Sequence, residues 1–280
     1  MHLQVRIVSA PSQSCTKSID PPPEPDRYVS AAMTDIPQQR SHPESEPVCT
    51  VCIANFNGLK VIDDCLQSVL AQDCAFHVEI IVHDDASTDG SADYIAANYP
   101  QVTLIRSEWN VGYCVSNNRM ARQARGQYLL LLNNDASLFP DALQTLQATA
   151  RMNSEPTILT LPQYEAATGR LVDRGLRLDP FLNATPNHDR SRLEVSTVHG
   201  ACLWIPTALW NALGGFPEWF HMLAEDLYLC CAARVRGTKI MVAAGSGYRH
   251  HIGYSLGGGK AQGNRLVTTT RRRALSERNK

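Results

Sequence analysis

The sequence has no apolar run that approaches the roughly 20 residues needed for a transmembrane helix. Its N-terminus also lacks the unbroken apolar segment of a secretory signal peptide. The formal net charge is only -1, so the chain as a whole is not attracted to nucleic acid. These absences predict a cytoplasmic protein without a nucleic-acid partner.

Nine cysteines are present, an odd number, and they are scattered along the chain. Cys49 and Cys52 form a C-x-x-C pattern inside the apolar run 48–54. Side chains three residues apart on a strand point to opposite faces, so this pair is poorly placed for zinc or redox chemistry. The pattern therefore favours buried, reduced cysteines in a cytosolic protein.

The first 47 residues differ in composition from the rest of the chain. They contain eight of the 16 prolines, together with many serines and glutamines, and they have too little apolar material for a core. We expect residues 1–47 to be a disordered tail, in which Met33 is a candidate alternative start.

The other end of the chain is basic. Residues 260–280 contain seven lysines and arginines against a single acid, Glu277. Each such charge is attracted to anionic lipid by about 1 kcal/mol near a membrane surface, so one prediction is peripheral attachment to the cytoplasmic face. A merely solvated, disordered tail is the open alternative.

Between these tails, strand-like and helix-like segments alternate from residue 48 onward. Apolar runs that predict strands are followed by segments with apolar residues at helical spacing. This alternation favours βαβ crossovers and a mainly parallel sheet, an α/β fold whose first half is residues 48–152. The expected strands are 48–54, 77–83, 102–106 and 127–132, and the expected helices are 60–72, a helix ending at 99, 115–125 and 140–152.

Residues 153–259 are less regular. We expect a polar, turn-rich segment at 163–192 that combines a hairpin with a mobile loop, and a glycine-rich loop at 245–259. The other expected elements are strands at 157–161, 196–205 and 239–243 and helices at 206–213 and 224–236.

Two polar clusters follow predicted strands. Asp84 and Asp85 end the second strand, and Asn133, Asn134 and Asp135 end the fourth. Ligands of open parallel sheets bind outside the carboxyl ends of the strands, so we expect both clusters at one edge. The first cluster can accept hydrogen bonds from a nucleobase or ribose, and the second suits a hard divalent cation that holds a diphosphate. The simpler alternatives, a helix cap and a polar turn, stay open for each cluster taken alone.

Two further groups lie in the second half. Glu225 and Asp226 open a predicted helix, where acids either complement the helix dipole or supply a general base for an acceptor hydroxyl. His250 and His251 lie in the predicted glycine-rich loop, where adjacent histidines are either structural or in contact with phosphate or metal. Each group therefore has a structural and a functional interpretation.

Eight short motifs follow one another between Val48 and Ser255. They are Asn55-Phe56-Asn57-Gly58, Asp84 to Ser91 (DDASTDGS), Asn110-Val111-Gly112-Tyr113 with Asn117, Leu132-Asn133-Asn134-Asp135, Gly200-Ala201-Cys202, Gly214-Gly215-Phe216, Glu225-Asp226 with Arg234 and Gly237, and His250 with Ser255. In this order the motifs resemble those of the family 2 glycosyltransferases, which have the GT-A fold. The closest resemblance is to the rhamnosyltransferase-like branch of that family.

The resemblance implies an inverting transfer from a nucleotide-diphosphate sugar to a hydroxyl of a glycan or lipid-linked acceptor, in cell-surface polysaccharide synthesis. Asp226 matches the family's catalytic base, and Asp135 matches the metal-binding end of its D-x-D motif, with His250 as a second candidate ligand. The implied cofactor is Mg²⁺ or Mn²⁺, and the implied donor is a dTDP-, UDP- or GDP-sugar. Glu225 and Gly200 are expected to support the acceptor side. The implied donor-binding residues are Asn55, Asn57, Asp84, Asp85, Asn110, Gly112, Asn117, Asn133 and Asn134.

Some positions depart from the family pattern. Asn133 replaces the first acid of the D-x-D motif, so metal binding is expected to depend heavily on the diphosphate. Tyr228 stands where the branch often has an acid, and residues 114–116 replace its usual small-residue run. These changes bear on substrate choice more than on fold. Residues 278–280 resemble the start of a C-terminal helix that family members often continue.

Rival enzyme classes lack their signature residues. A nucleotidyltransferase would have a glycine-rich, arginine-containing loop after the first strand, where this chain has residues 57–60. A Rossmann oxidoreductase would have G-x-G-x-x-G at the same place, and that motif is absent. A non-catalytic protein that binds sugar nucleotides or glycans stays the open alternative, because Asn133 and Tyr228 are departures from the pattern.

Overall fold

The computed structural model describes residues 46–251, 258–262, 265–268 and 274. Residues 1–45 of the predicted disordered tail and most of the predicted basic tail lie outside the described residues. Two short antiparallel strands, β14 (Gly258–Gln262) and β15 (Arg265–Thr268), are described from the C-terminal region. In the described part of the chain, no helix is long and apolar enough to cross a bilayer.

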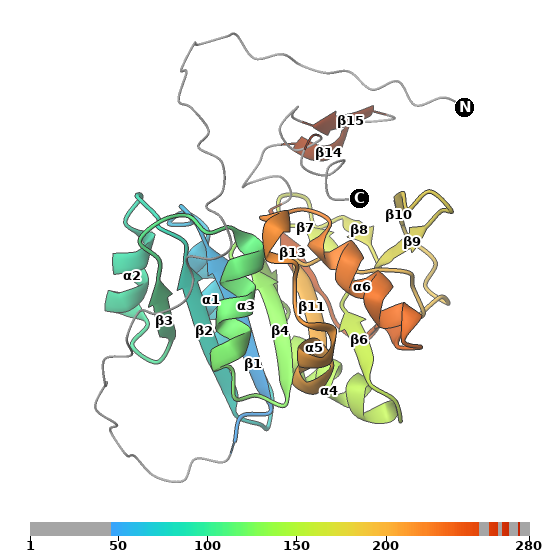
Figure 1. The fold of residues 1–280 in the computed structure, drawn as a ribbon, viewed down its shortest axis with the longest axis horizontal. Coiled ribbons are helices and arrows are strands. Elements are labelled where there is room, and N and C mark those ends of the chain that lie inside the picture. The colour runs from blue at the N-terminus through green and yellow to red at the C-terminus, as the bar shows by residue number, and fades with distance from the viewer. Residues whose placement is uncertain (1–45, 252–257, 263–264, 269–273, 275–280) are drawn as a thin grey trace. The chain divides into compact units, whose positions relative to one another are not determined.

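A seven-stranded mixed sheet forms the centre of residues 46–251 (Figure 1). Its strands, in spatial order, are β12 (Lys239–Val242), β6 (Thr157–Thr160), β11 (Cys202–Pro206), β4 (Tyr128–Asn133), β1 (Cys49–Asn55), β2 (Val78–Asp84) and β3 (Thr103–Arg106). The last four strands run parallel, which confirms the parallel sheet predicted for the first half. β11 is antiparallel to both of its neighbours, so the sheet changes direction where the second half joins the first.

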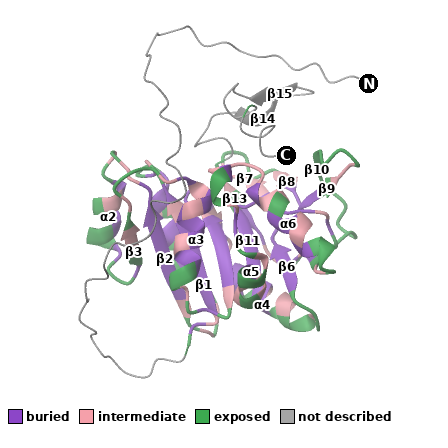
Figure 2. Cartoon of the chain, viewed as in Figure 1, coloured by how far each residue is buried: buried purple, intermediate pink, exposed green. Residues whose placement is uncertain are grey.

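Helices cover both faces of this sheet. One set packs into a first core cluster and consists of α1 (Ile62–Leu70), α2 (Ser91–Asn98) and α4 (Ala142–Met152). The other set packs into a second cluster and consists of α3 (Tyr113–Gln123), α5 (Thr207–Leu213) and α6 (Glu225–Val235). Figure 2 shows the strands buried between these layers, with exposed residues on the outer sides of the helices. The six helices expected from the apolar spacing are therefore present.

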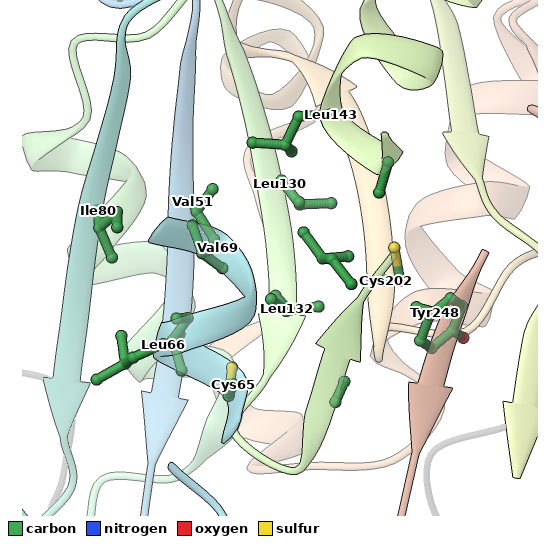
Figure 3. Close-up of a cluster of buried hydrophobic side chains, with 14 of the residues drawn as sticks. Val51, Cys65, Leu66, Val69, Ile80, Leu130, Leu132, Leu143, Cys202 and Tyr248 are labelled. Atoms are coloured by element: carbon green, nitrogen blue, oxygen red, sulfur yellow. The ribbon is translucent and has the colours of Figure 1, made fainter. Parts of the chain in front are cut away.

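The central strand β1 shows why its sequence is continuously apolar. Val51 and Ile53 pack into the first core cluster, whereas Cys52 packs into the second. A parallel strand covered by helices on both faces needs apolar side chains at successive positions. Figure 3 shows Leu66 and Val69 of α1 close to Val51 in the first cluster. Full burial of each such side chain stabilises the fold by about 1.5–3 kcal/mol.

The C-x-x-C pair behaves as predicted. Cys49 and Cys52 both lie on β1, are fully buried, and belong to different core clusters. Both thiols are free, and burial is the largest cause that raises the pKa of each. The pair is therefore core material and not a metal or redox site.

A second sheet of four short strands lies in the second half. Its order is β5 (Ala136–Leu138), β13 (Tyr248–His250), β7 (Gln163–Glu165) and β8 (Leu171–Asp173). The hairpin β9 (Leu176–Leu178) and β10 (Ala184–Pro186) follows β8. The segment at 163–192, expected to combine a hairpin with a mobile loop, thus contains two antiparallel pairs, β7–β8 and β9–β10.

Two expected elements of the second half are wrong in extent. The glycine-rich loop expected at 245–259 contains β13, because residues 248–250 pair with β5 on one side and β7 on the other. The strand expected at 196–205 joins the main sheet only at Cys202. The amides of Ser196 and Thr197 instead donate to the carbonyl of Leu176, which draws this segment toward β9.

Candidate active site

Two of the predicted polar clusters lie at the same edge of the main sheet. Asn55 at the end of β1 is in register with Asp84 at the end of β2. Ala54 is in register with Asn133 at the end of β4. Three neighbouring parallel strands therefore end in polar side chains at one edge, as the strand order predicts.

Asn55 connects these clusters through its side-chain amide. Its Nδ2 donates to Asp84 Oδ2 at 2.8 Å and to Ser91 Oγ at 2.9 Å. Its Oδ1 accepts a hydrogen bond from Asn134 Nδ2 at 2.9 Å. Asp84 also accepts one from the amide of Ser87 at 3.0 Å. Because Asn55 is fully buried, these bonds satisfy polar groups that would be costly to bury alone.

Asp85 fixes the loop that precedes α3. Its Oδ1 accepts the N–H of Val111 at 2.7 Å, and its Oδ2 accepts the N–H of Gly112 at 2.9 Å. Asn110 Nδ2 donates to the Asp85 backbone carbonyl at 3.3 Å. Gly112 has a φ of 90°, and an added Cβ there would lie 2.2 Å from His221 Nδ1, so the position requires glycine. Three predicted donor residues thus form one hydrogen-bonded unit.

The turn after β1 is joined to the turn after β2. Asn57, which has a positive φ of 51°, accepts the N–H of Thr88 on Oδ1 at 2.8 Å. Asp89 Oδ2 accepts the N–H of Leu59 at 2.8 Å. Burial alone would raise the pKa of Asp89, but hydrogen bonds from Ser91 and from the Leu59 amide outweigh it and lower that pKa. The predicted donor residue Asn57 is therefore part of a rigid double turn.

Asn117 is almost as buried as Asn55. Its side chain is 1% exposed, and its Nδ2 donates to the carbonyl of Tyr113 one helical turn earlier. Its Oδ1 is buried without a hydrogen bond.

Asp135 and His250 converge beside the second cluster. His250 Nε2 lies 3.0 Å from Asp135 Oδ1 and 3.5 Å from Asn133 Nδ2. Asp135 Oδ1 nevertheless has no well-directed hydrogen bond, although it is buried. His250 belongs to β13 and not to a loop, and the exposed His251 contributes its backbone N–H to the Asp135 carbonyl at 3.0 Å. An oxygen and an imidazole nitrogen that face each other without a hydrogen bond fit a divalent cation.

A complete protein-only metal site is not formed by these side chains. Within residues 46–251 and the short described segments after them, no group of three or more His, Cys, Asp or Glu is arranged to hold a metal ion. A cation at Asp135 and His250 would therefore need further ligands, as the presence of Asn133 in place of an acid already suggests.

Asp226 is the second residue of α6 and is held by two backbone amides. Its Oδ2 accepts the N–H of Gly200 at 3.0 Å, and its Oδ1 accepts the N–H of Leu227 at 2.7 Å. The adjacent Glu225 is 7% exposed, whereas Asp226 is partly exposed. Tyr113 Oη donates to the Gly200 carbonyl at 3.0 Å. Gly200 therefore joins the start of α3 to the start of α6.

The loop 199–201 also joins Asp226 to the second cluster. The N–H of Asn133 donates to the carbonyl of Ala201 at 3.1 Å. Ala201 directly follows Gly200, which binds Asp226. The structure thus brings all three predicted carboxylate clusters to one region of the fold.

Tyr248 on β13 lies among the carboxylates of Asp135, Asp173 and Asp226, which together are called the acidic region. It is 1% exposed, and its Oη donates to Gln163 Oε1 at 2.6 Å. Burial raises the pKa of Tyr248 well above its usual value, and the negative charges of Asp173, Asp135 and Asp226 raise it further. Asp173 therefore belongs to this region, although nothing in its sequence context marks it.

A strained segment precedes α6, and no local pattern in the sequence marks it. His221, Leu223 and Ala224 are non-glycine residues with positive φ values of 61°, 70° and 67°. The His221 carbonyl accepts the N–H of Cys114 at 3.1 Å, and its ring packs against Gly112. Such conformations cost on the order of 1–3 kcal/mol each and cluster at functional sites. Glycine or asparagine at these positions would have indicated positive φ values from the sequence alone.

Comparisons with known proteins match this architecture. The model of the family described as "Glycosyl transferase family 2" matches residues 50–206, more than half of the chain. The chondroitin synthase of Escherichia coli is 27% identical over 188 residues, which is 65% of this chain but only 26% of that protein. The chain therefore spans about a quarter of the length of this curated relative.

Solved structures share the fold. Staphylococcus aureus TarS 1-349 in complex with UDP has a TM-score of 0.57 and 21% identity, covering 72% of this chain and 59% of that one. GalNAc-T7 with UDP, GalNAc and Mn²⁺ has a TM-score of 0.61 and 18% identity, covering 74% and 44%. The rhamnosyltransferase-like branch stays a prediction. The chain belongs to glycosyl transferase family 2 and has the GT-A fold.

Proposed function

We propose that the protein transfers a sugar from a nucleotide-diphosphate sugar to a hydroxyl of a glycan or lipid-linked acceptor, with inversion at the anomeric carbon. In this reaction the bond between the anomeric carbon and the diphosphate oxygen breaks. A bond to the acceptor oxygen forms on the opposite face of the sugar. The hydroxyl proton passes to Asp226, and the nucleoside diphosphate leaves.

The observation that carries this proposal is the setting of Asp226. Its two oxygens are held by the amides of Gly200 and Leu227, and the residue is still partly exposed. A carboxylate has about four lone-pair sites, so two amides leave capacity to accept a proton from a hydroxyl. A base in a fixed orientation accelerates such a transfer by roughly 100- to 10,000-fold.

The proposed donor site is the edge formed by the ends of β1, β2 and β4. Asp84 and Asp85 are the proposed contacts for base and ribose, and the loop 110–112 lies on Asp85. Their internal hydrogen bonds support a site whose shape is set before the donor binds, which lowers the entropic cost of binding. UDP is the first nucleotide to test, because TarS is a fold neighbour solved with UDP.

Asp135 and His250 are the proposed holders of Mg²⁺ or Mn²⁺, with the donor diphosphate supplying further oxygens. Bound there, the cation would neutralise the charge that develops on the leaving diphosphate. The 3.0 Å approach of the two side chains supports this assignment, and GalNAc-T7 is a fold neighbour solved with Mn²⁺. Equal donor affinity with and without EDTA would count against it.

The test is turnover of the purified full chain. UDP-, GDP- and dTDP-sugars are supplied with Mn²⁺ and simple glycan acceptors. The anomeric configuration of the products is then determined by NMR. We expect transfer from one donor class with inverted configuration. Tight binding of a donor without hydrolysis or transfer would instead support the alternative, a non-catalytic sugar-nucleotide-binding protein. A product with retained configuration would refute the inverting mechanism.

A role in cell-surface polysaccharide synthesis is the proposed context, supported by the similarity to a chondroitin synthase. We propose that the protein works on the cytoplasmic side, where nucleotide sugars are the donors. Peripheral membrane contact through residues 260–280 stays a prediction, because most of that segment lies outside the described residues. The domain limits at 48 and 259 likewise stay proposals.

A further inference from the structure

A buried arginine without a partner lies next to the acidic region. Arg174 follows β8, is 7% exposed, and has its Nε sealed from solvent without a hydrogen bond. Within the described residues, its guanidinium takes part in none of the ion pairs, which involve other arginines and histidines. Arginine stays charged at any working pH, and a buried arginine is nearly always paired. Nε of Arg174 is therefore a buried donor without an acceptor among the described residues, and an anionic ligand can supply one.

The backbone around Arg174 is held in place on both sides. Its N–H donates to the Asn187 carbonyl at 2.8 Å, and Asn187 Nδ2 donates back to the Arg174 carbonyl at 3.1 Å. The next residue, Gly175, has a φ of 71° and donates its N–H to Asp173 Oδ1 at 2.9 Å. An added Cβ on Gly175 would lie 2.9 Å from Val195, so the turn has little freedom. Because its backbone is already held in place, Arg174 loses little conformational entropy when its guanidinium binds a ligand.

The position of Arg174 in the chain connects it to the proposed base. The preceding residue, Asp173, lies 3.5 Å from His199, measured from Oδ2 to Nε2. His199 directly precedes Gly200, whose amide binds Asp226. Figure 1 shows β7, β8 and β13 together near the upper edge of the main sheet. Arg174 therefore directly follows a residue that pairs with the segment holding the proposed base, and the proposed donor residues lie on other segments.

We propose that Arg174 anchors an acceptor subsite for an anionic group, either a carboxylate or a phosphate. This inference rests on the proposed transfer reaction and adds a substrate class to it, an acidic acceptor. The planar guanidinium forms paired hydrogen bonds with both kinds of anion. Asp173 is the nearest acid in sequence, but no ion pair joins it to Arg174 in the described structure, so it leaves the charge available.

The first experiment measures thermal stability and needs no turnover. Methyl glucuronide and inorganic phosphate are the two anion probes, and methyl glucoside is the neutral comparison, at matched ionic strength. We expect an anion to raise the Tm of the wild-type protein and the glucoside to leave it unchanged. Removing a buried donor that has no acceptor relieves its desolvation cost, so Arg174→Met should raise the Tm of the free protein by about 2–4 °C. The same substitution should abolish the anion-induced rise.

Arg177→Met is the matched control, because Arg177 is an exposed arginine three residues away on β9. We expect it to keep the wild-type Tm and the wild-type response to anions. If Arg174→Met lowers the Tm, or keeps the anion-induced rise, Arg174 is not the anion site. If that variant does not fold, Arg174→Gln replaces it, and a wild-type anion response in Arg174→Gln overturns the proposal.

A second set of measurements separates the sources of the anion. A larger Tm rise with methyl glucuronide than with phosphate supports an acidic sugar, and the reverse order supports a phosphate-linked acceptor. Saturating UDP should leave either rise in place, and its loss would show that the subsite belongs to the donor diphosphate instead. In the transfer assay, Arg174→Met should lower kcat/KM by about 10- to 100-fold for an acceptor that carries a carboxylate or phosphate. It should leave kcat/KM unchanged for an uncharged acceptor. Equal loss for both acceptors would refute the acceptor role.

Discussion

The Asp84–Asp85 turn and the second half of the site differ in how their polar groups are satisfied. Asp84 and Asp85 each accept hydrogen bonds on both carboxylate oxygens, although Asn117 Oδ1 and Asp135 Oδ1, which also belong to the first half, are buried without one. In the second half, Asp173 Oδ2, Arg174 Nε and His250 Nδ1 are buried without hydrogen bonds. Buried polar groups are normally satisfied within the fold, so unfilled capacity is where a ligand gains most. The difference indicates a donor side shaped in advance and an acceptor side completed by its ligand.

The largest effect should come from removing the proposed base in the second half. Asp226→Asn keeps the size of the side chain and removes its ability to take a proton. We expect the transfer rate to fall by roughly 100- to 10,000-fold, while donor affinity changes little because the donor lies on the first half. The measurement is kcat for transfer together with donor Kd by calorimetry.

Asp93→Asn is the control for that substitution. Asp93 is an exposed acid on α2 whose Oδ1 lies 2.8 Å from Arg106, so its loss removes one surface ion pair. Exposed pairs contribute about 0–1 kcal/mol, and the transfer rate should stay at the wild-type level. A wild-type rate in Asp226→Asn would show that another group takes the proton.

The second prediction tests whether the hydrogen bonds of Asn55 in the first half contribute more to stability than those of a comparable asparagine in the second half. Asn55→Ala removes the partner of Asp84, Ser91 and Asn134 in a fully buried position. Several buried groups would then lack partners, so the free energy of unfolding should fall by about 2–4 kcal/mol. Donor binding should weaken with it. Chemical denaturation and donor calorimetry measure the two effects.

The matched variant in the second half is Asn183→Ala. Asn183 is exposed, and its Nδ2 donates to Asp179 Oδ2 at 2.9 Å in the β9–β10 hairpin. Exposed substitutions of this kind usually change stability by about 0.5 kcal/mol or less. Equal losses for the two asparagine variants would remove the contrast between the halves.

This contrast also explains which features the sequence could predict. The apolar runs of β1, β2 and β4 exist because both faces of those strands are covered, so period and length are enough to find them. The polar residues that end these strands could be predicted in the same way, because each apolar run stops where its strand ends. Strand β13 has three residues and forms only by pairing with segments far away in the chain, so its local sequence reads as a loop. The second half therefore depends on long-range pairing that one sequence does not display.

The candidate site divides in the same way. Asp84, Asp135 and Asp226 are recognisable because acids at strand ends and helix starts are a local pattern. The unpaired state of Arg174 and the positive φ of His221 are properties of the folded surroundings. A polar, arginine-containing segment normally reads as solvated surface, and nothing in its composition shows that one arginine is buried.

A third prediction concerns the contact between the halves at Gly112. Gly112 and Gly169 have similar positive φ values of 90° and 69°, but only Gly112 has a neighbour, His221, in the way of a Cβ. Gly169→Ala should therefore cost only the backbone strain, about 1 kcal/mol. Gly112→Ala should cost about 2–3 kcal/mol, because His221 must also move.

A displacement of His221 should also shift the proposed base, Asp226. His221 lies in the strained segment that leads into Glu225 and Asp226, so Gly112→Ala is expected to lower kcat for transfer as well as stability. Gly169→Ala should leave kcat unchanged. If both glycine variants have the same stability and the same kcat, the two halves are not coupled through this contact.

The smallest predicted effect compares the same short motif in each half. Asp89 Oδ1 accepts hydrogen bonds from the N–H and the hydroxyl of Ser91, and Asp189 Oδ1 accepts the same two bonds from Ser191. Asp89 additionally accepts the amide of Leu59 and so joins two turns. Burial opposes it, but the hydrogen bonds lower the pKa of Asp89, and those from Ser191 lower the pKa of Asp189.

A lowered folded-state pKa means that the stabilisation exists above the unfolded pKa, near 4, and is lost as the pH falls through the folded value. At pH 7, Asp89→Asn should therefore destabilise the protein by about 1 kcal/mol, and its deficit relative to wild type should shrink at acidic pH. Asp189→Asn should have a smaller effect at every pH, because its hydrogen bonds close only a local, exposed turn. Denaturant unfolding at a series of pH values measures both curves. A pH-independent deficit for Asp89→Asn would mean that the charge of Asp89 does not strengthen the bonds that join the two turns of the donor half.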